Sequence, residues 1–321
     1  MFVLRVTLAL LLVLAVTGCT PAVEQQHSSD PSLATLRQVD DLPLYEMTLI
    51  GDYDPFADVQ AATPASPFGC SLFLAAGDRE RPVFARNFDW DPNPALLLHA
   101  DPPDGYASIS LVDISYLGIT NPMARPKELL KAPLLPFDGM NEKGLAIGLA
   151  ADTAGRAPAV AGRPTVGSVR IIRLMLDHAA TVDEALLWFD KYNLDFSGGP
   201  ALHYLISDAA GRSAVVEFID GQLRIEKSAG PWQAMTNFQL VPADAATRAA
   251  DRRYAITSGE LSKVNGALGW QGAMRVLQAV AQPHTRWSVT YELRTGDVHL
   301  ITGQKWDRIH TFKLAGVSPA N

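Results

Sequence analysis

The sequence contains little cysteine, with two residues, Cys19 and Cys70, among 321. Two cysteines cannot supply the disulfide framework of a small secreted domain, and a chain of this length buries roughly 75% of its unfolded surface without one. Charge is sparse and close to balanced, with 27 Lys and Arg against 34 Asp and Glu and no basic cluster, so nucleic acid is not expected as a partner. The 24 glycines and 22 prolines are too few for a low-complexity chain. A packed globular protein is therefore predicted.

Several catalytic and cofactor-binding patterns are also absent. The seven histidines show no ligand spacing such as His-x-x-x-His, and without spare cysteines a zinc site is not expected. The sequence has no Gly-x-Ser-x-Gly nucleophile elbow and no glycine-rich loop that would cradle a phosphate. No cofactor is therefore predicted.

The first residues have the pattern of an export signal. Arg5 is followed by a largely apolar run over residues 6–16, which is too short to span a bilayer, and then by Gly18-Cys19. Small residues directly before a cysteine resemble the lipobox of bacterial lipoproteins. We therefore predict a signal peptide at residues 1–18 and an extracytoplasmic lipoprotein, held at the outer membrane or the periplasmic face by acyl chains on Cys19. The alternative is an ordinary secretory signal that is cut later, so that Cys19 is discarded.

Cys70 is then the single remaining thiol. In an exported, oxidising compartment it has no partner for an internal disulfide, so it is either buried and inert or present for its reactivity. The residues around Cys70 in the sequence are needed to distinguish an inert thiol from a reactive one.

The coarse organisation is that of an α+β protein. Residues 20–35 are polar and lack periodicity, which predicts a tether, and residues 42–53 predict a strand. Strands followed by a contiguous block of helices and then strands again indicate α+β layers. The other predicted strands are at 70–76, 83–90, 145–151, 202–208, 213–219, 222–227, 288–293, 298–303 and 305–314, and helices are predicted around 172–179, after the capping box Thr181-x-x-Glu184, and from Trp270.

Four sequence fragments carry a resemblance to a known family. In chain order they are Gly69-Cys70-Ser71, Phe84-Ala85-Arg86-Asn87-Phe88-Asp89-Trp90, Phe137-Asp138-Gly139-Met140-Asn141-Glu142-Lys143-Gly144-Leu145 and Met235-Thr236-Asn237. The ordered set resembles the choloylglycine hydrolase family of linear amide C–N hydrolases, which have an N-terminal cysteine nucleophile and include bile-salt hydrolases and penicillin V acylases, with acid ceramidase as a relative. The resemblance covers residues 70–321. It implies a four-layer αββα sandwich of two antiparallel sheets.

The resemblance also implies a maturation step. In that family the cysteine thiol cleaves the peptide bond before it, here Gly69–Cys70, and the new N-terminal cysteine then hydrolyses amides. The chemistry is coherent, because an α-amine with a pKa of ~7.7–8.0 is partly neutral near operating pH and acts as the base that the thiol needs. Residues 19–69 are then a tether and propeptide, which we expect either to stay bound or to be released, and residues 70–321 are the catalytic domain. Glycine at 69 suits the contorted backbone that the cleavage demands.

Three further residues take roles from the resemblance. Arg86 is expected to favour the thiolate and lower its pKa below ~8.5, and Asp89 to accept from the α-ammonium group. The alternative for Arg-x-x-Asp is a surface ion pair, but the pair lies in an apolar, strand-like run where an unpartnered charge is costly. Asn237 matches the asparagine that stabilises the oxyanion, the alternative being a turn residue.

Two positions leave the assignment open or depart from the family. Arg252 aligns with the last active-site arginine, with its neighbour Arg253 as the substitute. Bile-salt hydrolases have an oxyanion-hole asparagine at the position of Ala151, so their substrate specificity is not transferred. Asn141 and Glu142 are expected to form a structural turn.

We therefore predict a cysteine amidase that hydrolyses a linear C–N amide bond of a small N-acyl compound. Loops at 91–107 and 115–136 are candidates for lining a pocket for a partly apolar acyl group. The alternatives are an acyltransferase of the same fold that moves the acyl group to an amine, a non-catalytic lipid-anchored binding protein, and a peptidase acting on folded proteins.

Overall fold

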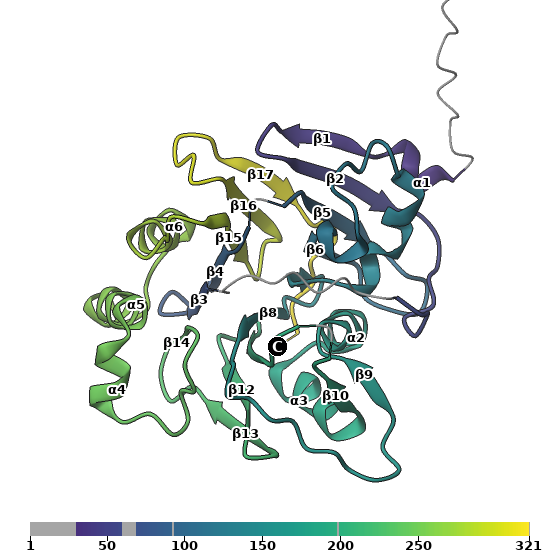
Figure 1. Ribbon diagram of the computed structural model, residues 1–321. Helices are drawn as coiled ribbons and strands as arrows, with labels where there is room; N and C mark the ends of the chain where they lie inside the picture. Colours follow the sequence, from purple (N-terminus) through teal and green to yellow (C-terminus); the bar gives the residue numbers. More distant parts are fainter. Residues whose placement is uncertain (1–29, 60–68, 92, 198, 321) are drawn as a thin grey trace, which may run out of the picture.

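The computed structural model describes residues 30–59, 69–91, 93–197 and 199–320 of the chain (Figure 1). The predicted signal peptide, the lipidation site at Cys19 and residues 20–29 of the tether lie outside the described residues. Within the described part, no helix is both long enough and apolar enough to cross a membrane.

Cys70 lies in a six-stranded antiparallel sheet with the strand order β14-β3-β4-β15-β16-β17. The strand that carries Cys70 and the next strand along the chain are buried along their whole length, which explains why both read as continuous apolar runs. The strands are β3 (Gly69–Ala75), β4 (Val83–Asp89), β14 (Trp232–Met235), β15 (Thr285–Glu292), β16 (Asp297–Thr302) and β17 (His310–Lys313).

The second sheet has nine strands in the order β1-β2-β5-β6-β7-β8-β11-β12-β13. Its pairs are antiparallel apart from β2 and β5, which run parallel, so the prediction of purely antiparallel sheets is wrong at this pair. Asp220 and Gly221, both with positive φ, make the tight turn between two of its strands, as their sequence predicts. The strands are β1 (Arg37–Asp40), β2 (Leu44–Leu49), β5 (Ala95–Ala100), β6 (Ser108–Asp113), β7 (Asp138–Asn141), β8 (Ala146–Ala151), β11 (Leu202–Ser207), β12 (Ser213–Ile219) and β13 (Gln222–Lys227).

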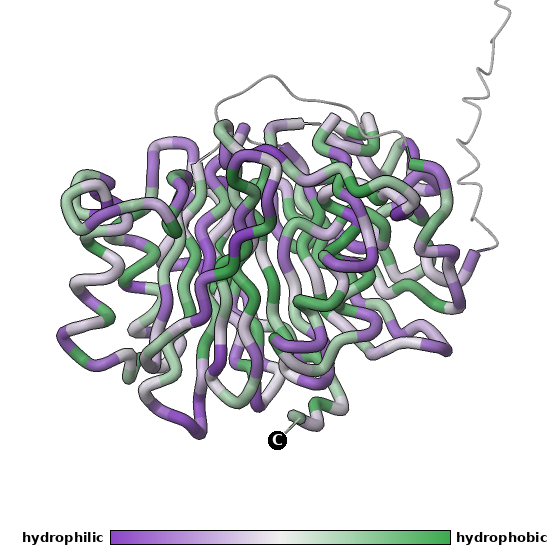
Figure 2. Tube along the Cα trace, turned by 90° about the horizontal axis from the view of Figure 1, so that it is seen from below, coloured by the Kyte–Doolittle hydropathy of each residue, from purple (hydrophilic) through white to green (hydrophobic). Residues whose placement is uncertain are grey.

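Helices cover the outer face of each sheet. Helices α5 and α6 pack on the six-stranded sheet, α2 and α3 pack on the nine-stranded sheet, and β3 faces β8 between them (Figure 1). The predicted α+β fold with two sheets between helical layers is therefore confirmed. In Figure 2 the turns at the lower rim are largely hydrophilic. The remaining elements are α1 (Pro31–Ala34), the 3₁₀ helices η1 (Ile114–Leu117) and η2 (Pro126–Leu134), α2 (Arg170–His178), α3 (Val182–Lys191), α4 (Ala245–Ala250), α5 (Arg252–Lys263), α6 (Trp270–Ala279), and the short parallel pair β9 (Thr165–Gly167) and β10 (Asn193–Asp195).

Local signals account for where the central helices begin. The Thr181 hydroxyl accepts a hydrogen bond from the Glu184 N–H at 3.2 Å, and the Glu184 carboxylate accepts one from the Ala180 N–H at 2.8 Å. This reciprocal capping starts α3 where the sequence predicts it. On α2, Ile172, Met175 and Leu176 are buried, as their helical spacing predicts.

Three predicted irregular regions contain ordered elements instead. Residues 31–34 of the predicted tether form α1, with Leu33 buried, and the predicted loop 91–107 contains strand β5. The predicted loop 115–136 contains η2. A short apolar run such as Ala95–Ala100 has no alternation because it is buried on both faces, so periodicity does not identify it.

The part of the chain before residue 60, which we call the N-terminal segment (residues 30–59), is built into the domain. Its strand β2 pairs with β5, and the buried Asp40 accepts hydrogen bonds from Thr302 at 3.1 Å, Arg308 at 3.0 Å and His310 at 2.6 Å. These three residues belong to the far end of the chain. The N-terminal segment is therefore part of the folded unit, although it precedes Cys70.

Candidate active site

Cys70 is the second residue of β3 and is completely buried. In the β3–β4 register Gly69 lies opposite Asp89 and Leu72 opposite Arg86. Because side chains alternate along a strand, Cys70 and Arg86 share one face and lie diagonally across the two strands. The spacing of sixteen residues between them is therefore the consequence of a hairpin with this register.

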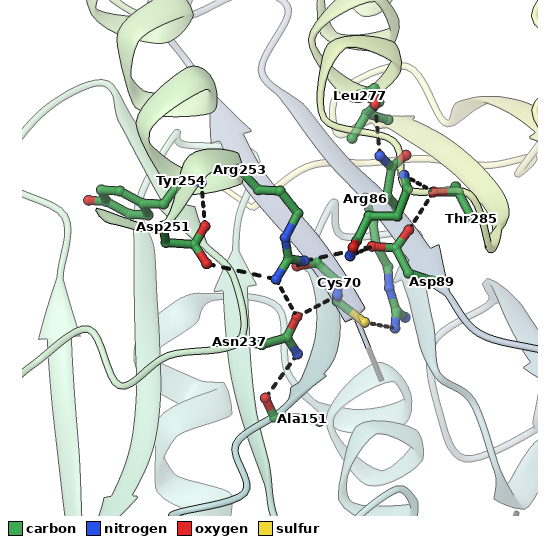
Figure 3. A network of polar contacts seen from close by, with 12 residues as sticks. Cys70, Arg86, Asp89, Ala151, Asn237, Asp251, Arg253, Tyr254, Leu277 and Thr285 are labelled. Atoms are coloured by element: carbon green, nitrogen blue, oxygen red, sulfur yellow. Dashed lines mark hydrogen bonds and ion pairs between the residues drawn. The ribbon is translucent and has the colours of Figure 1, made fainter. Parts of the chain in front are cut away.

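Arg86 is a buried cation held between the Asp138 carboxylate and the Cys70 thiol, and Figure 3 shows its guanidinium group beside the sulfur. Its Nη1 donates to Asp138 Oδ2 at 2.6 Å and to the Phe137 carbonyl at 2.7 Å, and its Nη2 lies 3.5 Å from the Cys70 Sγ. Asp138 also accepts from the Trp287 indole and the Tyr291 hydroxyl. Arg86 is therefore no surface ion pair, and its orientation is fixed by Asp138, a residue to which the sequence assigned no role.

The electrostatic balance at Cys70 differs from the prediction. Burial raises the pKa of the Cys70 thiol above its usual value, the nearby Arg86 and Arg253 partly oppose this, and Asp89 adds to it. Arg86 acts to lower this pKa as expected, but burial outweighs it, so the expectation that the thiol pKa lies below its usual value is wrong for the chain before cleavage. The physical reason is that the Arg86 charge is paired more closely with Asp138 than with the sulfur, so the loss of water around the thiol dominates.

Asp89 ends β4 beside the bond that is predicted to be cut. Its carboxylate accepts from Thr285 at 2.6 Å and from the Gln282 side chain at 2.8 Å, and lies 3.7 Å from Arg253 Nη1. Burial raises the pKa of Asp89, while these hydrogen bonds and the arginine oppose the rise. Asp89 is thus held next to the backbone of residues 69 and 70, where the predicted α-amine would form.

Gly69 has no room for a side chain. A Cβ there would lie 2.3 Å from the Gln282 side-chain nitrogen and 3.0 Å from an Asp89 oxygen. Its φ does not lie in the left-handed region, so the glycine is needed for close approach to these two side chains rather than for the contorted backbone that the sequence suggested.

Asn237 follows β14 and contacts the nucleophile position directly. Its Oδ1 accepts from the Cys70 N–H at 2.6 Å, and its Nδ2 donates to the Ala151 carbonyl at 2.9 Å. In the uncleaved chain the amide therefore points its acceptor at Cys70 and a donor at position 151. Ala151 is the position at which this chain departs from the pattern of the bile-salt hydrolases. It contributes its backbone carbonyl to the site, and not a side chain.

Arg253, and not Arg252, reaches the site. The Arg253 Nη1 donates to the Cys70 carbonyl at 2.5 Å and its Nη2 donates to Asn237 Oδ1 at 3.0 Å, whereas Arg252 is exposed (Figure 3). The N-cap Asp251, which accepts from the Tyr254 N–H at 2.8 Å, begins α5 and sets which of the two arginines faces the sheet. The first choice of Arg252 is therefore corrected to its neighbour.

The loop that carries Asn237 is fixed by a second buried acid. Glu217 on β12 accepts from the Leu240 N–H at 2.6 Å and from the Val241 N–H at 2.9 Å, and lies 3.3 Å from His203 Nδ1. No sequence pattern pointed to Glu217, because its partners are two backbone groups more than twenty residues away. Asn141, in contrast, bonds to Leu176 and Ala179 carbonyls and caps a turn, as predicted.

A cavity of about 650 Å³ begins next to this cluster. Tyr116 and Phe137 line it, and the Phe137 carbonyl is one of the acceptors of Arg86. Among the predicted lining loops, 115–136 contributes Tyr116 and Leu135, whereas the described residues of 91–107 contribute none to this cavity. Within the part of the chain that the structure describes, no group of three or more His, Cys, Asp or Glu side chains is placed to hold a metal ion.

Parts of the chain are similar in sequence to known proteins. Residues 133–247 match the family model of acyl-coenzyme A:6-aminopenicillanic acid acyl-transferase. A penicillin V acylase from Pectobacterium atrosepticum is 31% identical over 182 residues, which cover 52% of this chain and 48% of that protein, so the match spans about half the length of the relative. Over these matched regions the chain is similar to that acyl-transferase family and to a penicillin V acylase.

Solved structures with a similar fold superpose on most of this chain. The penicillin V acylase of Agrobacterium tumefaciens superposes with a TM-score of 0.57 at 18% identity, over 78% of this chain and 88% of that one. A mutant of the conjugated bile acid hydrolase from Clostridium perfringens superposes with a TM-score of 0.56 at 16% identity, over 77% of this chain and 92% of that one. The sandwich that the sequence resemblance implied is therefore the fold of these relatives.

Proposed function

We propose that this protein hydrolyses the amide bond of a small N-acyl compound, with Cys70 as the nucleophile after cleavage of the Gly69–Cys70 bond. The observation that carries the proposal is the convergence of Arg86, Asn237 and Arg253 on Cys70 from β4, the loop after β14 and α5. Arg86 contacts the buried thiol, and Asn237 and Arg253 contact the Cys70 backbone. Polar groups from separate elements around a buried cysteine are the arrangement that nucleophilic catalysis needs.

The steps follow from the contacts. In the first step the Cys70 thiol attacks the Gly69 carbonyl, and the Gly69–Cys70 C–N bond breaks to give a thioester and a free Cys70 amine. Water then hydrolyses the thioester, which frees the thiol and leaves a carboxylate on Gly69. That amine then takes the thiol proton while the sulfur attacks the substrate carbonyl, and it returns the proton to the leaving amine. Asp89 orients the amine, and the side-chain amide of Asn237 donates to the oxyanion once it turns from the Ala151 carbonyl. Water completes the cycle by releasing the acyl group.

Intact-mass measurement of the purified protein tests the cleavage. A large fragment that begins at Cys70 is expected for the wild type, and one continuous chain for Cys70→Ala. A panel of N-acyl amides, assayed on the wild type and on Cys70→Ser, then tests the hydrolysis. A fully active wild type without a chain end at residue 70 contradicts the proposal, and so does a Cys70→Ala protein that is cleaved normally. Binding of amides without turnover supports the non-catalytic alternative.

The family match favours one second function. The model that matches residues 133–247 is that of an acyltransferase, so the acyl group on Cys70 could pass to an amine in place of water. Product analysis with and without an added amine separates the two functions. Formation of a new amide in preference to the free acid identifies a transferase.

We also propose that the protein is an exported lipoprotein anchored through Cys19, and that the fragment 19–69 stays bound after cleavage. The membrane anchor rests on the lipobox-like sequence alone. Retention is supported by the pairing of β2 with β5 and by the hydrogen bonds to Asp40. Incorporation of labelled fatty acid into the wild type but not into Cys19→Ala tests the anchor.

A further inference from the structure

The cavity that Phe137 shares with the Cys70 cluster has one wall made by residues that precede the cleavage bond. Phe56, Ala57, Asp58 and Val59 line it, together with the stretches 165–170 and 195–202. We call residues 53–59 the wall segment. Although the wall segment precedes the predicted cut in the chain, it lies against the catalytic part of the fold.

Helix α2 holds the wall segment at two points. Arg170, its first residue, donates from Nη1 to the Pro55 carbonyl at 2.8 Å and to the Ala57 carbonyl at 2.6 Å. Two turns later, Asp177 accepts from the Tyr53 hydroxyl at 2.8 Å. Arginine bonds to backbone carbonyls fix the path of the chain, which leaves the side chains of the wall segment free to meet a ligand.

The chemistry of the wall favours an uncharged, apolar acyl group. Phe56 lines the cavity and is 54% exposed, and Val59 packs against the core. Leu149, Val166 and Leu202 also line the cavity. The charge of Arg170 is balanced by the nearby Asp54 and Asp58, so the cavity does not present an unpaired cation to a substrate carboxylate. Covering an exposed ring with an apolar group is favourable by about 25 cal/mol per Å².

We infer that the wall segment remains in the mature protein as part of the acyl-binding pocket, and that Phe56 sets which acyl groups are accepted. The inference rests on the proposed amidase function. The small fragment is then a specificity subunit as well as a tether, and it contributes to the pocket a side chain that the large fragment lacks.

The experiment compares Phe56→Ala with Ile50→Ala. Ile50 is a matched control, because it is 51% exposed, belongs to the same small fragment and lies outside the cavity lining. Rates are measured on N-acyl p-nitroanilides with acyl chains of increasing length and with a phenylacetyl group. We expect Phe56→Ala to change the ratio of kcat/KM between the best and the next acyl group by about tenfold or more. Ile50→Ala is expected to keep the wild-type ratio within about twofold.

A second measurement follows the fragment itself. Native mass spectrometry of cleaved wild type is expected to show both fragments bound one to one. An unchanged ratio in Phe56→Ala overturns the inference. If the wild type is cleaved and active but Phe56→Ala keeps the wild-type ratio, the role of the wall segment is contradicted and the proposed function is not. A wild type that is neither cleaved nor active contradicts the proposed function, and the inference with it.

Discussion

At the scale of single residues, Cys70 is subject to opposing electrostatic effects. Burial and Asp89 raise the pKa of its thiol, whereas Arg86 and Arg253 act to lower it. The net effect is a raised pKa, because the closest cation is already paired with Asp138. Before cleavage the sulfur therefore holds its proton at neutral pH, and there is no free α-amine to remove it.

The pH dependence of maturation follows from this direction. Since the thiol pKa is raised, its proton leaves only at higher pH, and the rate of cleavage is expected to rise with pH and reach its midpoint above the ordinary thiol value of ~8.5. Intact-mass sampling of newly refolded protein between about pH 5 and pH 10 measures this rate. A midpoint at or below about pH 7 contradicts the raised pKa.

The two adjacent arginines provide a matched pair for mutation. Arg253→Ala removes hydrogen bonds to the Cys70 carbonyl and to Asn237, each from a charged donor. A hydrogen bond to a charged group is worth about 1.5–3 kcal/mol, so kcat/KM is expected to fall roughly tenfold to a hundredfold. Arg252→Ala, at the exposed neighbour, is expected to leave the rate unchanged. Equal losses in both variants would show that neither side chain acts at the site.

At the scale of elements, the loop after β14 is positioned from outside the site. Glu217 accepts two of its backbone N–H groups, and the Gln239 side chain donates to Asp152 at 2.9 Å. Asn237 therefore depends on β12 and on the turn after β8 for its place. A carboxylate suits this task because both of its oxygens accept.

Glu217→Gln tests this dependence. The amide presents a donor where the loop also donates, so about 1–3 kcal/mol of stability is lost and the melting temperature falls by several degrees. We also expect kcat to fall about tenfold, because Asn237 loses its position. Glu260→Gln, which breaks an exposed pair with Lys263, is the control and is expected to change neither quantity. A lower melting temperature with wild-type kcat would mean that the loop keeps its position without Glu217.

The strands around Cys70 could be predicted from the sequence because their signals are local. The runs that became β3 and β4 are continuously apolar, and the turn at Asp220-Gly221 accounts for the hairpin of β12 and β13. The position of Asn237 next to Cys70 followed from the family resemblance and not from any pattern in the chain. Periodicity does not show which residues from distant elements come together.

The missed features have a common cause, which is that each depends on a distant partner. Arg253 faces Cys70 because α5 begins at Asp251 and packs on the sheet, and the sequence shows only two arginines in a row. Asp138 matters because it orients Arg86. Glu217 matters because it accepts hydrogen bonds from backbone groups more than twenty residues further along the chain. Strand β1 is four residues long, too short to show an alternation.

At the scale of the whole molecule, the N-terminal segment is joined to the C-terminal strands by a buried charge. Burial alone would raise the pKa of Asp40, but hydrogen bonds from His310, from the Leu42 N–H and from Thr302 outweigh it and hold this pKa well below its usual range. The folded state therefore favours the carboxylate. Its stabilising contribution is present above the ordinary value of ~3.9 and is lost as the pH falls below it.

Asp40→Asn is expected to loosen the small fragment. Asp40 is buried but its partner Arg308 is half exposed, so loss of the carboxylate charge is expected to cost about 1–3 kcal/mol. The cleaved variant is therefore expected to lose more of the fragment 19–69 than the wild type does during gel filtration at neutral pH. The wild type is expected to release the fragment near about pH 3 or below. Asp41→Asn is the control, because Asp41 is 78% exposed although it also contacts Arg308. If the wild type, Asp40→Asn and Asp41→Asn all keep the fragment 19–69 equally well, Asp40 does not hold the fragment to the domain.

The position of β2 has a consequence for solubility. In the nine-stranded sheet β1 and β2 occupy one end, so the strand behind them, Ala-Leu-Leu-Leu-His-Ala, has its backbone groups satisfied by β2. Without that cover its unpaired N–H and C=O groups would lie open beside a run of leucines, which is a template for association with other chains. A protein that shed its first fragment would be prone to self-assembly through this edge, and light scattering after acid release of the fragment should detect the aggregates.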